Sequence, residues 1–251
     1  MFDAVVLAGG GKVEPLTEQE KVSNKAFILL HNKPLLTHIL SALEEAPSVK
    51  QIVVVGPANE LQVLQDAGYS FEIAQEKGGM LDNLAAGFET VDQNQPCLVV
   101  TSDIPLLRAD VIEHFLALCA PHDHDFYYPV LSRKTCLESF PDTERTYVRL
   151  KEGPVTGGNI GLLRPSWFLN NRERLEMFIS YRKKPLKMMR ILPLTMILKY
   201  LLKTLTVSDL ESYLSRLLKL KARAVPCECV EIAVDVDKVN DLELVKKVLQ
   251  D

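Results

Sequence analysis

The sequence predicts an α/β fold in which the strands of a mostly parallel sheet alternate with helices. Residues 4–7 form a short, continuous apolar run, which is typical of a strand buried on both faces of a parallel sheet. The segments 51–56 and 97–101 have the same character, and a stretch with helical periodicity follows each of them. Strand and helix units that alternate at this length predict a doubly wound sheet.

The first 120 residues can be divided into such units. We expect a strand over 26–30, after which Pro34 starts a helix. The core-facing side chains of this helix follow the spacing i, i+3, i+4, i+7; they are Leu36, Ile39, Leu40 and Leu43. A weaker strand is expected over 69–74, and further helices over 59–66, after Gly79 and over 111–119.

The alternation ends beyond residue 121. Strands are expected over 126–131 and 147–150, and a tight turn over 154–161 leads into a strand at 160–163. The block 167–222 is mostly helical and basic, and Ser208 with Glu211 has the spacing of a capping box. A strand-rich segment over 225–236 and a helix from about Asn240 follow. We expect a single domain over 1–251, with 167–222 as a helical insertion.

Residues 186–202 are the most apolar long segment. Lys187, Arg190 and Lys199 interrupt it, so it lacks the roughly 20 apolar residues that a membrane crossing needs. A helical hairpin within the core is the simpler interpretation. The alternative is a basic amphipathic surface that rests on lipid or covers a lipid-like or bulky substrate.

Charge and cysteine content limit the partners and the compartment. The net charge is −4, which gives no general attraction to nucleic acid, so we expect no nucleic-acid partner. The five cysteines are odd in number and scattered, which favours reduced thiols over a disulfide framework. No basic segment followed by an apolar one opens the sequence. We therefore expect a cytoplasmic protein without a transmembrane segment.

Three glycines follow the first strand directly. Gly9, Gly10 and Gly11 leave the backbone N–H groups uncovered, and consecutive N–H groups of this kind bind anions. Lys12 adds a compact positive charge. The spacing differs from that of a P-loop, which has four residues between its glycines and a Ser or Thr after the lysine. The segment is therefore a candidate phosphate site of another type.

Three aspartates are candidate metal ligands. Asp103 follows the strand at 97–101, so it and the glycines should share the crevice at the carboxyl ends of the strands; a plain strand-end turn or helix cap is the alternative. Asp235 and Asp237 alternate along the chain, and we expect them to point to opposite faces. In that case one of them binds metal, with Asp235 slightly favoured.

These segments together resemble one family. The resemblance rests on residues 7–12, Asn24-Lys25, 31–36, Ser102-Asp103 with Ile104-Pro105, the turn Thr156 to Asn159, and 235–242. They occur in the order seen in MobA-like nucleotidyltransferases, which are related to molybdenum-cofactor guanylyltransferases and sugar-phosphate nucleotidyltransferases. The resemblance implies a Rossmann-like, three-layer α/β/α sandwich of the nucleotide-diphospho-sugar transferase type. It also implies an enzyme that uses an NTP and Mg²⁺ and releases pyrophosphate.

The resemblance assigns roles to individual residues. Lys25 would stabilise charge on the α-phosphate, and Lys12 would follow the leaving pyrophosphate. Asn24 departs from the family, in which proline usually precedes the lysine. The remaining roles fall into three groups: nucleotide binding by Leu7, Ala8, Gly9, Gly10, Gly11, Gly78, Asn83 and Asp103; acceptor binding by Gly157, Gly158 and Asn159; and Mg²⁺ binding by Asp103, Asp235 and Asp237.

The leading hypothesis is therefore a Mg²⁺-dependent nucleotidyltransferase that transfers NMP from GTP or CTP to a small phosphorylated or hydroxylated acceptor. A nucleotide-sugar-dependent glycosyltransferase is one alternative, but such enzymes usually carry two nearby aspartates where Asp103 stands alone. A non-catalytic nucleotide-binding protein is another. The sequence leaves open whether the chain forms a homodimer.

Overall fold

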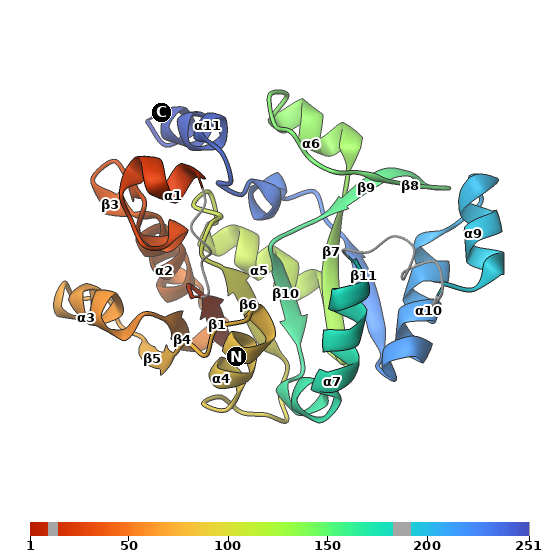
Figure 1. The fold of residues 1–251 in the computed structure, drawn as a ribbon, viewed down its shortest axis with the longest axis horizontal. Helices are drawn as coiled ribbons and strands as arrows, with labels where there is room; N and C mark the ends of the chain where they lie inside the picture. Colours follow the sequence, from red (N-terminus) through yellow and green to blue (C-terminus); the bar gives the residue numbers. More distant parts are fainter. Residues whose placement is uncertain (10–14, 183–191, 251) are drawn as a thin grey trace.

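A central mixed sheet organises the computed structural model, which describes residues 1–9, 15–182 and 192–250 (Figure 1). The strand order is β5-β4-β1-β6-β10-β7-β9-β8, and β11 pairs with β7. The strands are β1 (Phe2–Leu7), β4 (Val49–Gly56), β5 (Glu72–Gln75), β6 (Cys97–Thr101), β7 (Phe126–Ser132), β8 (Val148–Leu150), β9 (Gly153–Gly157), β10 (Ile160–Leu163) and β11 (Ala222–Pro226). β2 (Leu29–Leu30) and β3 (Lys33–Pro34) form a separate hairpin.

The sheet has two halves. β5, β4, β1 and β6 are paired in parallel, as their long apolar runs predict. β10 and β9 run against their neighbours, whereas β11 is parallel to β7. The mostly parallel α/β fold is therefore confirmed, with antiparallel pairing in the second half of the sheet.

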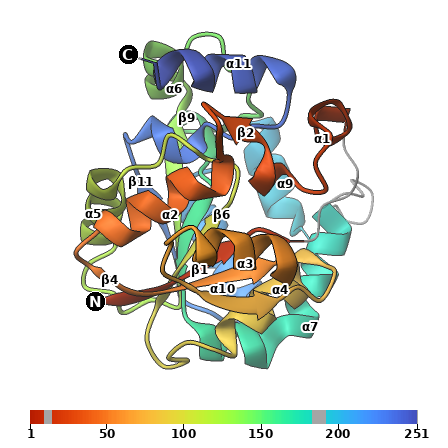
Figure 2. The same ribbon diagram turned by 90° about the vertical axis from the view of Figure 1, so that its left-hand side faces the viewer.

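Helices cover both faces of the sheet, which makes three layers (Figure 2). Side chains of β1 alternate between the two interfaces: Ala4 and Val6 pack in one core with α2, α5 and α11, and Val5 packs in the other with α4 and α7. The helices are α1 (Pro15–Glu20), α2 (Leu35–Glu45), α3 (Ala58–Asp66), α4 (Met80–Phe88), α5 (Ala109–Leu118), α6 (Arg133–Ser139), α7 (Pro165–Arg182), α9 (Leu194–Leu201), α10 (Val207–Leu218) and α11 (Val239–Val248), with 3-10 turns η1 (Lys25–Phe27) and η2 (Val230–Ala233).

Several local expectations are wrong. The strand expected over 26–30 is replaced by η1 and the two-residue β2, because Asn24 caps a 3-10 turn there. Part of the turn expected over 154–161 is the strand β9. The capping box of α10 uses Thr206 and Asp209 in place of Ser208 and Glu211.

The apolar segment at 186–202 lies partly outside the described residues. Within 192–202, α9 lies at the surface and only Met196 is buried, so the core hairpin is wrong for this part. Leu194, Leu201 and Leu202 are exposed. Among the described residues, we find no helix with the length and apolar character that a bilayer crossing requires.

Candidate functional site

The ends of β1 and β6 lie side by side. Leu7 is paired with Thr101, and the Ser102 N–H donates to the Leu7 carbonyl at 3.3 Å. On the other side, the Ala8 N–H donates to the Val55 carbonyl at 2.8 Å. Gly9 and Asp103 therefore emerge from one edge of the sheet.

Gly9 lies against the start of α4. A Cβ added to Gly9 would lie 2.5 Å from Glu76 Oε2 and 3.1 Å from Asn83 Nδ2, so a larger residue there would require Glu76 to shift. Asn83 is buried, and its Oδ1 accepts from the Lys77 N–H at 2.7 Å. Its Nδ2 makes no hydrogen bond with the described residues. The structure thus brings Asn83 to the end of β1.

Other predicted nucleotide-binding residues stand apart from this contact. Gly78 occupies an exposed turn with φ +107°, and a Cβ there would meet nothing within 4 Å. Its positive φ gives a structural reason for glycine. Gly10, Gly11 and Lys12 lie outside the described residues. Their part in a phosphate cradle stays a prediction.

Asn24 ties η1 to the end of β1. Its Oδ1 accepts from the Ala26 N–H at 2.9 Å, and its Nδ2 donates to the Ala8 carbonyl at 2.7 Å. The first contact caps the 3-10 turn, and the second connects that turn to the residue before Gly9. Asn24 therefore holds Lys25 beside the sheet edge, which is a physical role for asparagine where the family pattern has proline.

The segment around Val236 carries two carboxylates to Asp103. Val236 is fully buried, and its N–H donates to the Asp103 carbonyl at 2.9 Å. One carboxylate oxygen from each of Asp103, Asp235 and Asp237 lies within 4.8 Å of the others. The expectation that Asp235 and Asp237 point to opposite faces is wrong, because residues two apart in an extended segment share a face and the buried side belongs to Val236.

Within the described part of the chain, each carboxylate contacts a different polar side chain. The Thr101 hydroxyl donates to Asp103 Oδ1 at 2.6 Å, and Arg145 Nη1 donates to Asp235 Oδ1 at 2.9 Å. Lys25 Nζ forms an ion pair with Asp237. These partners fix the orientation of the three groups and leave further carboxylate lone pairs for a ligand.

Burial shapes the charge of the cluster. Burial and, to a smaller extent, the negative charge of Asp235 raise the pKa of Asp103 to about 6, although the Thr101 hydrogen bond opposes this shift. Burial also raises the pKa of Asp235, although Arg145 opposes the shift. Clustered carboxylates of this kind repel one another, and a divalent cation with a preference for oxygen ligands relieves that repulsion. The donor set therefore fits Mg²⁺.

The first turn of α11 holds the loop that carries Asp237. Asp241 Oδ2 accepts from the Asp237 N–H at 3.1 Å and from the Lys238 N–H at 2.7 Å. A carboxylate in this position satisfies N–H groups at the helix start that have no partner within the helix. The conformation of the loop is thus set by residues on both sides of Asp237.

The predicted acceptor turn lies beside the same cluster. The Asn159 N–H donates to the Ile232 carbonyl at 2.7 Å, and its carbonyl accepts from the Thr101 N–H at 3.1 Å. The Gly157 carbonyl accepts from Arg145 Nη2 at 3.1 Å. A Cβ on Gly158 would lie 2.9 Å from Ile232 Cγ1, so the turn packs closely against η2. Asn159 Nδ2 is buried without a partner among the described residues.

Sequence reasoning missed Arg145 and Thr101. Arg145 lies in an irregular segment before β8, where an arginine looks like any surface cation, yet its side chain is only 12% exposed. Its Nε is buried and unpartnered among the described residues. Thr101 lies two residues before Asp103, and this alternation was the one available signal that the two side chains share a side.

Comparison with curated proteins identifies relatives that match nearly half of the chain. A molybdenum cofactor guanylyltransferase from Shewanella loihica is 30% identical over 124 residues, which is 49% of this chain and 59% of that protein. The homologous protein of Shewanella sediminis is 30% identical over 46% of this chain and 56% of its own length. The chain thus matches somewhat more than half the length of these curated relatives.

Solved structures extend the comparison to the whole fold. A hypothetical transferase from Thermus thermophilus superimposes with a TM-score of 0.84 and 33% identity, over 96% of this chain and 99% of that one. CMP:2-keto-3-deoxy-manno-octonic acid synthetase, solved with CTP, shares the fold at a TM-score of 0.65 and 14% identity, over 100% of this chain and 99% of its own. The model of the MobA-like NTP transferase domain matches residues 4–213. The chain therefore belongs to the MobA-like NTP transferase family.

Proposed function

We propose that the protein is a Mg²⁺-dependent nucleotidyltransferase that transfers NMP from GTP or CTP to a small phosphorylated or hydroxylated acceptor. The observation that carries the proposal is the convergence of Asp103, Asp235 and Asp237 with Lys25 beside the end of β1. The names of the relatives support the choice of nucleotide, because two are guanylyltransferases and one structural neighbour was solved with CTP. Five free thiols support a cytoplasmic location.

The reaction joins an acceptor oxygen to the α-phosphorus of the NTP and breaks the bond from that phosphorus to the bridging oxygen of the β-phosphate. Pyrophosphate then leaves with the bonding electrons. The protein must align the two reactants and neutralise negative charge as it builds up. Asp103, Asp235 and Asp237 would hold Mg²⁺, which supplies electrostatic stabilisation of the phosphates when bound.

Lys25 stabilises the α-phosphate during transfer. Its ammonium group is paired with Asp237, and its side chain is 17% exposed. Asp237 would hold Mg²⁺ together with Asp103 and Asp235, and Lys25, which lies beside Asp237, would then contact the α-phosphate. Asn83, which lies against Gly9, contacts the nucleotide, and Lys12 stabilises the charge of the leaving pyrophosphate. The turn with Gly158 and Asn159 contacts the acceptor.

Pyrophosphate release with each of the four NTPs, Mg²⁺ and a panel of acceptors tests the proposal. We expect release with GTP or CTP that requires an acceptor. Lys25→Ala and Asp103→Ala should each lower the rate by about 100-fold or more, because each removes a group that stabilises developing charge.

Two exposed residues provide matched controls. Lys134→Ala on α6 and Asp66→Asn on α3 remove charges at the surface and should leave the rate unchanged. Release of UDP from a UDP-sugar without pyrophosphate formation would indicate a glycosyltransferase instead. Tight NTP binding without turnover of any acceptor would indicate a protein that only binds nucleotide.

A further inference from the structure

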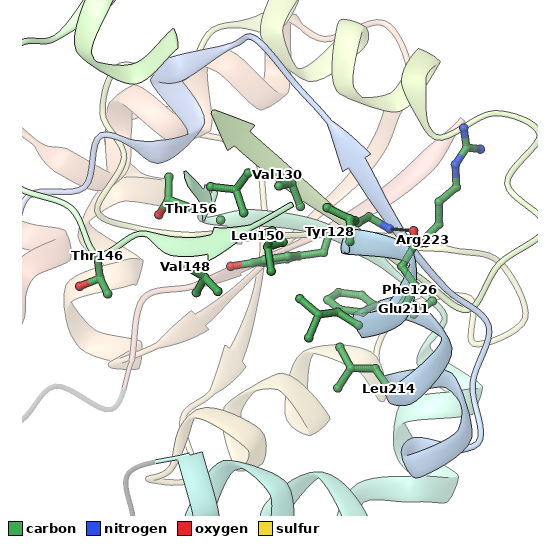
Figure 3. A pocket seen from close by; sticks show the side chains of 16 residues that line it. Phe126, Tyr128, Val130, Thr146, Val148, Leu150, Thr156, Glu211, Leu214 and Arg223 are labelled. Atoms are coloured by element: carbon green, nitrogen blue, oxygen red, sulfur yellow. Dashed lines mark hydrogen bonds between the residues drawn. The ribbon is translucent and has the colours of Figure 1, made fainter. Parts of the chain in front are cut away.

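A cavity of about 320 Å³ lies between the second half of the sheet and α10 (Figure 3). Strands β7, β8, β9 and β11 form one wall, and α10 forms the other. Most of its lining is aliphatic or aromatic; examples are Phe126, Val130, Leu150, Val155, Leu210 and Leu214. A space of this size falls at the lower end of the range for small-molecule sites, which are mostly apolar and concave.

The two charged residues that line the cavity, Glu211 and Arg223, both have hydrogen-bonded partners. Glu211 Oε1 accepts from the Ala224 N–H at 2.6 Å, and Arg223 Nη1 donates to the Ala120 carbonyl at 2.9 Å. Figure 3 shows the guanidinium group of Arg223 directed away from the other lining side chains. The Arg223 charge therefore lies away from the cavity, and one Glu211 carboxylate oxygen is held by the backbone of the lining residue Ala224, so the mostly apolar lining favours an uncharged body for the occupant.

One end of the cavity is polar. Thr146 and Thr156 lie at this end, and the hydroxyl of Tyr128 points toward it and ends near Val148 (Figure 3). A Cβ added to Gly157 would lie 1.9 Å from the Tyr128 hydroxyl oxygen. The hydroxyl therefore lies directly against the backbone of Gly157, which explains the glycine at this position.

The polar end borders the carboxylate cluster. Gly157 lines the cavity, and its carbonyl accepts from Arg145 Nη2. The other terminal nitrogen of Arg145 donates to Asp235, and the residue after Arg145 is the lining residue Thr146. One arginine therefore separates the cavity from the proposed metal site.

We propose that this cavity holds the apolar body of the acceptor, so that the acceptor is an amphiphile with a phosphate or hydroxyl head and an aliphatic or aromatic body. The proposal rests on the proposed nucleotidyltransferase function and specifies its second substrate. A polar acceptor would leave its hydroxyl or amide groups without partners along the apolar walls, which is costly. An apolar body gains free energy from leaving water, in proportion to the area it buries.

Binding of n-alkyl phosphates of increasing chain length tests the inference. Isothermal titration calorimetry is carried out with the intact protein in Mg²⁺ buffer without nucleotide, using ethyl, butyl, hexyl and octyl phosphate below their micellar concentrations. We expect affinity to rise by about fourfold per methylene group until the cavity is full. The same series, with GTP or CTP, should show kcat/KM for pyrophosphate release rising in parallel.

A matched pair of variants locates the effect. Val148→Trp places an indole at the rim of the cavity, and Val63→Trp places one on α3; both valines are exposed, at 46% and 64%, so folding should tolerate either change. Val148→Trp should abolish the gain with chain length and leave GTP and CTP binding unchanged. Leu214→Trp, which fills the interior, should act in the same way. Val63→Trp should behave as wild type.

The outcomes separate the two proposals. Two results would overturn the proposal of an amphiphilic acceptor and leave the proposed nucleotidyltransferase activity intact. One is turnover of polar acceptors with no dependence on chain length. The other is a Val148→Trp variant that keeps the full dependence on chain length. Absence of any alkyl phosphate binding would also overturn the amphiphilic acceptor. Chain-length-dependent binding that Val148→Trp removes, with no NTP turned over by any acceptor, would refute the nucleotidyltransferase and with it the acceptor role of the cavity.

Discussion

Asp103 holds its proton to a higher pH than an ordinary aspartate, because burial and the charge of Asp235 raise its pKa to about 6. Its position at the edge of the sheet was predictable from its place after an inner strand. Its environment was not, because Thr101 and Arg145 complete the cluster through contacts between distant segments. The role of Asn24 was likewise not predictable from the sequence. Its hydrogen bonds to Ala8 and Ala26 explain an asparagine where the family pattern has proline.

The raised pKa of Asp103 makes stability depend on pH when metal is absent. The folded state binds this proton more tightly than the unfolded state, for which the ordinary pKa is 3.8. The stabilising contribution is therefore complete below about pH 4 and is lost as the pH rises through about 6. In EDTA at pH 7.5, Asp103→Asn should be more stable than wild type by about 2 kcal/mol.

Urea unfolding of both proteins, with and without Mg²⁺, measures this effect. Mg²⁺ should stabilise the wild type and have little effect on Asp103→Asn. Asp66→Asn, in an exposed position, serves as the control. Equal stability of wild type and Asp103→Asn at every pH would contradict the assigned ionisation.

At the scale of elements, the parallel half of the fold was the most predictable part. β1, β4 and β6 are buried on both faces, so each reads as an uninterrupted apolar run, and α2, α4 and α5 follow at clear helical spacing. The antiparallel half has short strands, and Pro154 with its neighbouring glycines made β9 look like a turn. Tertiary pairing with β7 overrides that local signal.

Helix α4 approaches the sheet closely at Gly87. A Cβ there would lie 2.5 Å from Val5 Cγ1 and 2.9 Å from Val55 Cγ2. Gly87→Ala should therefore destabilise the protein by about 1–3 kcal/mol, although alanine in an open helix position would stabilise it by about 1 kcal/mol. Since α4 also carries Asn83, the displacement should weaken NTP binding as well.

A double-mutant cycle in urea unfolding checks the contact. Val5→Ala removes the methyl groups that Gly87→Ala meets, so the two changes together should cost less than the sum of the single changes. Gly68→Ala in an exposed turn serves as a comparison, because its strain would come from the backbone angle φ of +104° and from no contact with a neighbouring side chain in the described part of the chain. Additive effects of Gly87→Ala and Val5→Ala would mean that α4 does not press against β1.

At the scale of the whole molecule, the site is assembled from segments more than 130 residues apart. Asp103 lies at the end of an inner strand, whereas Asp235 and Asp237 come from a segment that returns over the sheet edge after β11. The resemblance in sequence predicted this gathering, whereas the expectation that Asp235 and Asp237 point to opposite faces did not anticipate that both carboxylates lie near Asp103. The hydrogen bond from Val236 to the Asp103 carbonyl joins the two segments.

Mg²⁺ should therefore stabilise a contact between distant parts of the chain. At a concentration tenfold above its Kd, Mg²⁺ should slow amide exchange of the Val236 N–H by about tenfold where that exchange occurs from a metal-free open form. Hydrogen–deuterium exchange with mass spectrometry resolves the peptide around Val236 from a reference peptide in α3. The α3 peptide should exchange equally in Mg²⁺ and EDTA; an unchanged rate around Val236 would contradict its role as the joint of the site.

The hydrogen bond from Val236 to the Asp103 carbonyl joins a late segment of the chain to an early one, which determines when the proposed activity can begin during synthesis. The region matched by the family model, residues 4–213, ends before two of the three clustered carboxylates. In a chain still on the ribosome, β1, β4 and β6 emerge long before Asp235 and Asp237, so the carboxylate cluster is incomplete until residue 237 has emerged. Under the proposed function, such a chain would be unable to consume nucleoside triphosphates while its synthesis is under way.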